Sequence, residues 1–362
     1  MKNVDNESQK NHHLIIPIFI MNSGCPHRCI FCNQKITAGK FPLKITKDYF
    51  DAEIHSYLTW NKDKSRKVEI AFYGGSFTGV DPEYQEELLS WANAFMKRKL
   101  VHSLRISTRP DYISTDHLTL LKKQGVDTVE IGAQSFVDDV LQKAHRGHNA
   151  EDVEQAMTLL KENGFKTGLH LMVGLPQDTK EGFLYSIDKT IALQPDTARI
   201  HPVIVFKHTI LADQFNKGEY KPLNLPDAVE LCRLAWERLS LAGIRVIRTG
   251  LQTTPEMEKN GAVLAGPIHP AFGTLVLSSV FYHYIIKLLS DISPNTQELR
   301  CRVCHRDIST FRGFNNSNMK AIKKLYPLTN LIVESSKNQD RGKIYITTDS
   351  GTSHILKIPG LV

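Results

Sequence analysis

Apolar and polar positions over the first two thirds of the chain predict repeated helix–strand units. Three segments with helical apolar spacing end at Gly125, Gly164 and Gly243, and a β-rich run follows each glycine. Glycine is common at a helix C-terminus because it accepts a positive φ without a steric penalty. Asp81 and Asn149 stand where such helices begin, as N-cap residues do.

Further β-rich runs lie at 67–77, 103–111 and 195–205. Residues from about 13 to 250 are therefore expected to form six β/α units or slightly more. Strands that alternate with helices in this way form a parallel sheet. The pattern is compatible with an open sheet and with a barrel. In both, ligands bind at the carboxyl ends of the strands.

Four strand ends carry motifs that are candidates for chemistry. The first strand, LIIPIFI, runs toward three cysteines. The later strands run into Gly74-Gly75-Ser76, Gly132-Ala133-Gln134-Ser135 and Gly174-Leu175-Pro176. Because parallel strands share one carboxyl edge, we expect these loops to converge.

Composition indicates a globular protein, and the net charge is compatible with an anionic partner. The 362 residues are 41% hydrophobic and 23% charged, with a net charge of +7. This excess is compatible with RNA but does not require it. The N-terminus has no apolar run typical of a signal peptide, and residues 271–290 are interpreted as a buried helix. The expectation is a cytoplasmic protein without a membrane partner, in which clustered cysteines bind metal.

Cys25, Cys29 and Cys32 form a C-x3-C-x2-C loop, one ligand short of a closed zinc site. A cubane cluster has four irons, each usually held by one thiolate, so three cysteines leave one iron open for another ligand. The alternative is a structural zinc loop that uses a further residue such as His27.

The loop CPHRCIFC, with Phe31 before its last cysteine, resembles the radical S-adenosylmethionine (radical SAM) superfamily. The resemblance implies a partial (β/α)6 barrel and a [4Fe-4S] cluster on Cys25, Cys29 and Cys32. It also implies that the cluster cleaves S-adenosylmethionine (SAM) to a 5′-deoxyadenosyl radical, which abstracts a hydrogen atom from the substrate. A flavodoxin or ferredoxin is the usual electron donor of such enzymes.

The same resemblance implies a set of SAM-binding residues at the strand ends. A glycine turn admits the close approach of an amine to backbone carbonyls, and a guanidinium suits a carboxylate. His170 lies where several relatives carry an aspartate. The implied cofactor-binding residues are Gly74, Gly75, Ser76, Glu130, Gln134, Ser135, Arg146 and His170.

Within the superfamily, FYGGSFTG, TRPDYI, VEIGAQS, RGH and LHLMVGLPQDT resemble the catalytic subunit of Elongator over about residues 14–250. This implies RNA, and tRNA in particular, as substrate. No acetyltransferase-like coenzyme A loop is evident among the remaining 112 residues, so the chain is expected to be a short bacterial form. The alternatives are radical chemistry on a small molecule or cofactor precursor, and a non-enzymatic RNA-binding protein with a structural metal loop.

The expected organisation is a disordered tail at 1–12, the barrel with its closing segment at 13–298, and a basic α+β module at 299–362. In the module, RGFNNSN between the first strand and a helix resembles the G-x-x-G loop of KH domains, with Asn316 in place of the second glycine. The module is either an RNA-binding domain or a solvated basic face. His269, Cys301 and Cys304 are expected to be structural.

Overall fold

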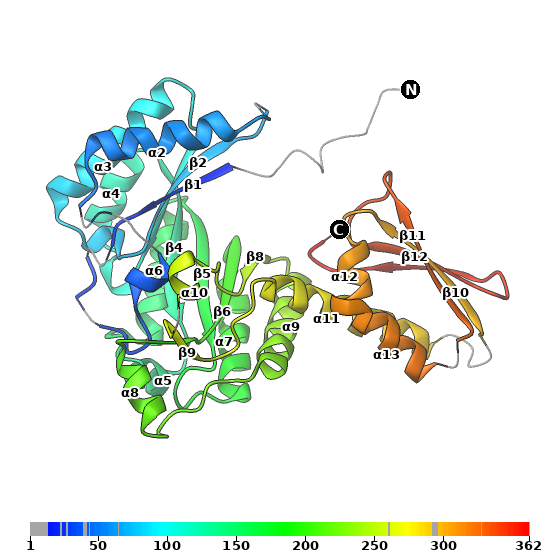
Figure 1. Ribbon diagram of the computed structural model, residues 1–362. Coiled ribbons are helices and arrows are strands. Elements are labelled where there is room, and N and C mark those ends of the chain that lie inside the picture. The colour runs from blue at the N-terminus through cyan, green and yellow to red at the C-terminus, as the bar shows by residue number, and fades with distance from the viewer. Residues whose placement is uncertain are drawn as a thin grey trace.

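The computed structural model describes residues 14–361 except 22–23, 27, 39–41, 43, 64, 260, 292–295 and 327. The predicted tail at 1–12 and His27 therefore lie outside the described residues. The described chain forms a curled β/α body and a smaller C-terminal module, which lies beside it in Figure 1.

Seven parallel strands form the sheet of the β/α body, in the order β1-β2-β3-β4-β5-β6-β8. Each strand except the last follows its neighbour in sequence, so the chain winds in one direction around a partial barrel, as predicted (Figure 1). The two outer strands, β1 and β8, do not pair with each other. The strands are β1 (Leu14–Phe19), β2 (Val68–Tyr73), β3 (Ser103–Thr108), β4 (Val126–Gln134), β5 (Lys166–Val173), β6 (Thr197–Pro202) and β8 (Arg245–Thr249).

Helices connect successive strands and cover the outer face of the sheet. Their N-caps are those expected: the Asp81 side chain accepts from Tyr84 N, and Asn149 forms a capping box. Gly125 and Gly164 follow helix ends with φ of 75° and 68°, the left-handed conformation that glycine tolerates. These helices are α2 (Lys47–Trp60), α3 (Pro82–Lys97), α4 (Thr115–Lys123), α5 (Asp138–Lys143), α6 (Ala150–Glu162), α7 (Lys180–Leu193), α8 (Ile210–Asn216) and α9 (Leu225–Leu241).

Side chains alternate along the strands between an apolar outer face and a polar inner face. On β2, Ile70 and Phe72 are fully buried in the core beneath the helices. Their neighbours Glu69 and Tyr73 point to the inner face, because successive side chains of a strand point to opposite faces. The inner face of the curl is therefore lined by groups that can bind a polar ligand.

The segment after β8 returns to the rim where the cysteine loop lies. β9 (Val263–Ala265) pairs antiparallel with β7 (Val205–Phe206), which follows β6 directly. α10 (Pro255–Glu258) contacts α1 (Gln34–Thr37), and Thr254 donates from its hydroxyl to the carbonyl of Ile36 at 2.7 Å. This segment closes the barrel against the helix that follows the three cysteines.

The C-terminal module is a four-stranded sheet in the order β11-β10-β12-β13, packed on helices. Two of its elements were not expected from the sequence, α12 and β13. The predicted loop around Gly313 consequently lies between α12 and α13 rather than between a strand and a helix. The module comprises β10 (Glu298–Cys304), α12 (Ile308–Arg312), α13 (Ser317–Leu325), β11 (Asn330–Ser336), β12 (Lys343–Thr348) and β13 (Ser353–Lys357).

α11 (Phe272–Ser290) joins the module to the β/α body. It packs against α9 on one side and against α12 and α13 on the other. Core residues of the module, such as Val303 and Phe311, belong to the same continuous apolar core as the strands of the barrel. Within the described residues, α11 is the one helix whose length and composition would allow it to cross a membrane.

Candidate active site

The cysteine loop packs backbone to backbone against the turn that follows β2. Gly24 has φ +70°, and a Cβ there would lie 2.1 Å from the carbonyl oxygen of Ser76. A Cβ on Gly79 would lie 2.3 Å from the carbonyl oxygen of Gly24. Only glycine fits at these two positions, so the contact fixes the cysteine loop beside Gly74 and Gly75, as the sequence predicted for the strand ends.

The far end of the cysteine loop is anchored by Ile30, which is 1% exposed. Its N–H donates to the carbonyl of Ala144 at 3.2 Å, and its carbonyl accepts from Leu211 N at 2.9 Å. The loop is thus held by the end of α5 and the start of α8. Cys25 and Cys29 lie between the glycine contact and this anchor, and Cys32 follows the anchor by two residues.

Cys25 and Cys32 are exposed and Cys29 is half-buried. Surrounding protein atoms and the neighbouring Cys29 raise the pKa of Cys25, and the same two causes raise the pKa of Cys32 to about 12. Among the described residues no three His, Cys, Asp or Glu side chains stand in metal-ligand geometry. The donor set itself, three thiols on one loop, can hold three of the four irons of a cubane cluster and leaves the fourth open.

Arg146 connects the cysteine loop to the end of β4. Its Nη1 donates to Sγ of Cys29 at 3.0 Å and its Nη2 to the carbonyl of Gly132 at 2.6 Å. Its Nε donates to Nε2 of His148 at 3.2 Å. Burial, together with Arg146, lowers the pKa of His148 to about 4, so this imidazole is a neutral acceptor at pH 7. Arg146 therefore places a positive charge beside the cysteines.

Gln134 is strained and incompletely bonded. Its φ is 69°, and the pairing of β4 with β5 shifts register between Ile131 and Gln134. Its side-chain Oε1 is buried and has no hydrogen-bond partner among the described residues. A strained residue with an unsatisfied buried acceptor at a strand end is typical of a ligand-binding position.

Ser76 and Ser135 are brought to the same rim, but their hydroxyls are already bonded within the protein. Ser76 is fully buried and its Oγ lies 2.9 Å from Oγ1 of Thr108. Ser135 is 1% exposed and its Oγ accepts from Val137 N at 3.1 Å. Their side chains stabilise the loops, which leaves their backbone groups as the candidates for ligand contact.

Glu130 is the centre of an ion-pair network on the inner face of the sheet. Its Oε1 accepts from Arg199 Nη2 at 3.0 Å and from Arg105 Nη1, and Arg105 also pairs with Glu69 at 2.9 Å. Burial alone would raise the pKa of Glu130, but Arg199 and Arg105 hold it below its ordinary value. Arg199 donates in addition to the hydroxyl of Tyr73 at 2.7 Å.

His170 faces His201 across β5 and β6. Their ring centroids are 4.3 Å apart, and both Nε2 atoms are buried without a hydrogen-bond partner among the described residues. Burial and the nearby Arg199 lower the pKa of His170 to about 4, and burial with His170 lowers the pKa of His201 well below its ordinary value. The pair is neutral at pH 7 and keeps free ring nitrogens beside the network of Glu130.

Several residues of this inner face were not predicted from the sequence: Glu69, Tyr73, Arg105, Arg199, His201 and Arg248. Each occupies a strand position on the face that carries Glu130 or His170, so their alternate spacing with those residues is the signal that could have identified them. Arg248 pairs in register with Arg199. Burial and that neighbour lower the pKa of Arg248. With Glu69 and Glu130, the three arginines give the inner face one net positive charge.

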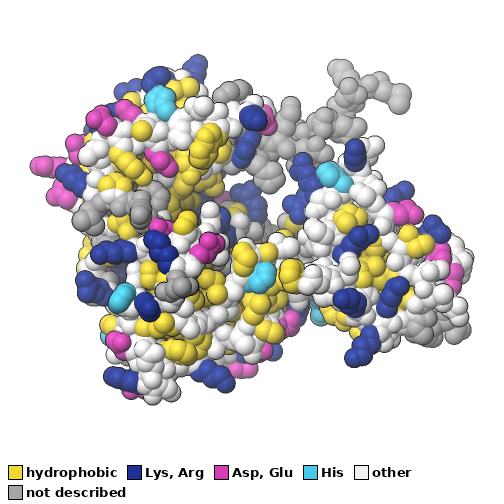
Figure 2. Space-filling model, in the orientation of Figure 1, with side chains coloured by type: hydrophobic (Ala, Val, Ile, Leu, Met, Phe, Trp, Pro, Cys, Tyr) yellow, Lys and Arg dark blue, Asp and Glu magenta, His cyan; other side chains and the backbone are white. Residues whose placement is uncertain are grey.

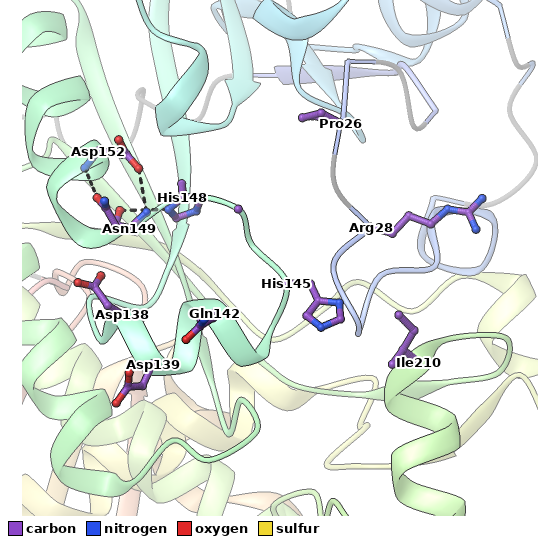
Figure 3. A pocket seen from close by; sticks show the side chains of 11 residues that line it. Pro26, Arg28, Asp138, Asp139, Gln142, His145, His148, Asn149, Asp152 and Ile210 are labelled. Atoms are coloured by element: carbon purple, nitrogen blue, oxygen red, sulfur yellow. Dashed lines mark hydrogen bonds between the residues drawn. The ribbon is translucent and has the colours of Figure 1, made fainter.

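A pocket of 760 Å³ opens on the outer flank of the cysteine loop. Figure 3 shows Pro26 and Arg28 of that loop on one side, the acidic residues Asp138 and Asp139 of α5 opposite, and His145 between them. None of the predicted SAM-binding residues lines this pocket. It adjoins the rim through His148, which lines the pocket and accepts from Nε of Arg146 at 3.2 Å.

Comparison with known proteins identifies the family of the chain. Residues 19–189 match the family model of the radical SAM superfamily, and residues 195–280 match that of the Radical_SAM C-terminal domain. The chain belongs to the radical SAM superfamily. The predicted family and fold are thereby confirmed, and the non-enzymatic alternative gives way to a radical SAM enzyme whose cofactors are a [4Fe-4S] cluster and SAM.

Proteins similar to this chain include a tRNA uridine(34) acetyltransferase, Elongator complex protein 3 and the heme chaperone HemW of Bacillus subtilis. The chain is 26% identical over 305 residues to a tRNA uridine(34) acetyltransferase of Methanocaldococcus jannaschii, covering 68% of this chain and 56% of that protein. It is 31% identical over 187 residues to Elongator complex protein 3 of Homo sapiens, covering 46% of this chain and 34% of that protein. The chain thus spans about half, or less, of the length of these curated relatives.

The archaeal Elp3 structure of Methanocaldococcus infernus shares the fold. The TM-score is 0.57 at 22% identity, and the match covers 76% of this chain and 63% of that one. This similarity supports the partial barrel that the sequence predicted. The residue assignments rest on the geometry described above.

Proposed function

We propose that Cys25, Cys29 and Cys32 hold the [4Fe-4S] cluster and that the adjoining rim binds SAM for modification of RNA, with tRNA as the substrate. The observation that carries the proposal is the position of Arg146, which bonds both Cys29 and Gly132. Arg146 joins the cysteine loop to the end of β4, while Gly24 packs that loop against the turn that follows β2. One short rim therefore combines a cluster donor set with polar groups for a zwitterionic cofactor.

Different residues of this rim would bind different groups of SAM. Gly74, with φ 99°, turns the chain so that backbone carbonyls can accept from the cofactor amine. Arg146 supplies the charge that suits its carboxylate. The free Oε1 of Gln134 can accept from a hydroxyl or amine. When bound, the reduced cluster supplies one electron that splits SAM into methionine and a 5′-deoxyadenosyl radical, which takes a hydrogen atom from the substrate.

The inner face supports an anionic substrate region beside that rim. Its arginines exceed its carboxylates by one, and Arg248 has no carboxylate partner among the described residues. The neutral pair of His170 and His201 offers free nitrogens to a polar group. The similarity to a tRNA uridine(34) acetyltransferase supports RNA as the substrate class.

The test is anaerobic reconstitution with iron and sulfide, followed by reduction in the presence of SAM. We expect four irons per chain and formation of 5′-deoxyadenosine, stimulated by bulk tRNA. Cys29→Ala should lose both iron and product. Cys304→Ala, which removes a buried thiol of the module, should keep both. Zinc bound in place of iron, without any 5′-deoxyadenosine, would contradict the proposal, and a lack of tRNA stimulation would contradict its substrate.

A further inference from the structure

One surface of the C-terminal module carries only positive charge. This surface, called here the basic surface, is formed by residues 305–326. Its one carboxylate, Asp307, is 1% exposed and is bonded to Arg341. None of its exposed basic side chains forms an ion pair with a carboxylate of the described residues, and Figure 2 shows dark-blue side chains over the part of the module where α12 and α13 lie in Figure 1. These side chains are Arg306, Arg312, Lys320, Lys323 and Lys324.

The three lysines project from one side of α13 into solvent. They stand at helical spacings of three and four residues, which places them on a common face. The opposite face is buried through Ile322, which is 0% exposed, and through Asn318, which donates to the carbonyl of Ser278 on α11 at 3.0 Å. The packing of α13 therefore holds its charges away from the core.

An exposed aromatic ring lies next to these charges. Phe314 is 61% exposed and belongs to the turn between α12 and α13. Gly313, Asn315 and Asn316 have φ of 75°, 51° and 59°, so the turn presents Phe314 outward between α12 and α13. An outward aromatic ring among cations is the combination by which proteins bind single-stranded nucleic acids, since bases stack on the ring and phosphates meet the charges.

The basic surface adjoins the rim of the barrel. The ring of Phe314 meets the ring of His269 edge-on, with centroids 5.9 Å apart. His269 lies between β9 and α11, in the segment that returns from the rim beside the cysteine loop. Its Nδ1 accepts from Ala271 N at 3.0 Å, so the contact is held in place. A polymer on the basic surface would thus lie next to the segment that closes the active site.

We propose that the basic surface binds a single-stranded region of RNA, with a base on Phe314 and phosphates on the lysines of α13. This inference rests on the RNA substrate proposed above and assigns the part of the molecule that holds it. An acidic protein would satisfy the charges, but it gives no role to an exposed aromatic ring set among them. Stacking and charge together favour the nucleic acid.

The experiment measures binding of a fluorescent single-stranded RNA of about 16 nucleotides to the full chain by anisotropy. The salt concentration is varied from about 0.05 to 0.3 M, because removing one lysine that neutralises a phosphate should lower the slope of log Kd against log salt by about 0.7. Lys320→Gln, Lys323→Gln and Lys324→Gln together should therefore lower the slope by about 2. Phe314→Leu, which keeps an apolar side chain but removes the ring, should weaken binding by about tenfold with the slope unchanged.

A matched control changes three basic residues of the β/α body, at the C-terminal end of α3: Lys97→Gln, Arg98→Gln and Lys99→Gln. It removes the same charge and should leave the slope and Kd almost unchanged. Equal losses in the control, or unchanged binding in the α13 variant, would overturn the proposal. The proposal would also be overturned if the α13 variant bound RNA normally but its cluster were reduced more slowly by an acidic flavodoxin. That result would assign the surface to a protein partner.

The two proposals fail in different ways. The basal formation of 5′-deoxyadenosine without RNA should be the same in the α13 variant as in the unmodified chain. If that activity is present while the RNA measurements show no loss, only the assignment of the basic surface is wrong. If RNA binds as expected while 5′-deoxyadenosine is never formed, the proposed chemistry fails and the binding surface stands.

Discussion

Replacing Glu130 by glutamine tests whether the inner network stabilises the barrel. The change keeps the size of the side chain but removes the charge that Arg105 and Arg199 share. Glu130 is 6% exposed, so both guanidiniums would lose a partner in a largely dehydrated site. Removing one member of a buried ion pair costs about 3–5 kcal/mol. The lower figure, about 3 kcal/mol, is the better choice because Arg105 keeps Glu69 and Arg199 keeps the hydroxyl of Tyr73.

This loss of unfolding free energy corresponds to a lower melting temperature (Tm). An unfolding entropy of about 2.1 cal/mol/K per residue over 362 residues is roughly 0.76 kcal/mol/K. A loss of about 3 kcal/mol therefore lowers the Tm by about 4 °C, as measured by calorimetry near pH 7. The control is Glu154→Gln, which breaks the half-exposed pair with Lys189. It should lower the Tm by about 1 °C or less.

The dependence on pH gives a second, independent check. Because the folded-state pKa of Glu130 lies below its ordinary 4.5, its contribution is complete above that value and is lost as the pH falls through the folded pKa. The difference in Tm between the two chains should therefore be constant from about pH 6 to 8 and should shrink below about pH 4.5. A difference under about 1 °C at neutral pH, or one that grows in acid, would refute the reasoning.

Three further perturbations have defined outcomes. Gly24→Ala should abolish most iron binding, measured as iron per chain after reconstitution, because its Cβ would meet the carbonyl of Ser76 at 2.1 Å. The control Gly218→Ala is also at positive φ but has nothing within 4 Å of the new Cβ, so it should bind iron normally. Equal iron in both variants would show that the contact is unimportant. The His170 ring should show no NMR titration above about pH 5, because burial and Arg199 lower its pKa to about 4. The stability that its neutral form contributes should be lost as the pH falls below 6.5. An NMR titration midpoint near 6.5 would contradict the burial of this ring. Asp307→Asn should lower the Tm by about 1–4 °C, because Arg341 and the backbone N–H of Gly342 lose a buried carboxylate acceptor; an unchanged Tm would show that these bonds do not stabilise the module.

The sequence predicted those parts of the fold whose signals are local. Capping residues such as Asn149 and glycines such as Gly164 mark helix ends directly, and a chain of alternating units can form few sheets other than a parallel one. The convergence of the cysteine loop with the Gly74 turn followed from the shared edge of that sheet. α12 was missed because its five residues are too few for a periodic apolar pattern.

The site was predicted less completely because its charges are paired across strands. Arg199 and Glu130 are 69 residues apart, and only the register of β4, β5 and β6 brings them together. Within a single strand, an arginine at alternate positions also fits a solvent-exposed face. Which face the curl encloses depends on the whole sheet, so the inner lining became evident only in the folded chain. The contact of His269 with Phe314 likewise joins two segments that no local pattern relates.

The shared position of α11 between the barrel and the module has a consequence for how the molecule unfolds. Because the apolar core runs without a break from the strands of the barrel through α11 to Phe311, neither part can lose its packing without exposing the other. We expect a single cooperative melting transition rather than two. A ligand bound only to the module would then raise the unfolding free energy of the barrel as well, by an amount set by its concentration relative to its Kd. Ligand binding at one end of the chain would thus protect the other end against thermal unfolding.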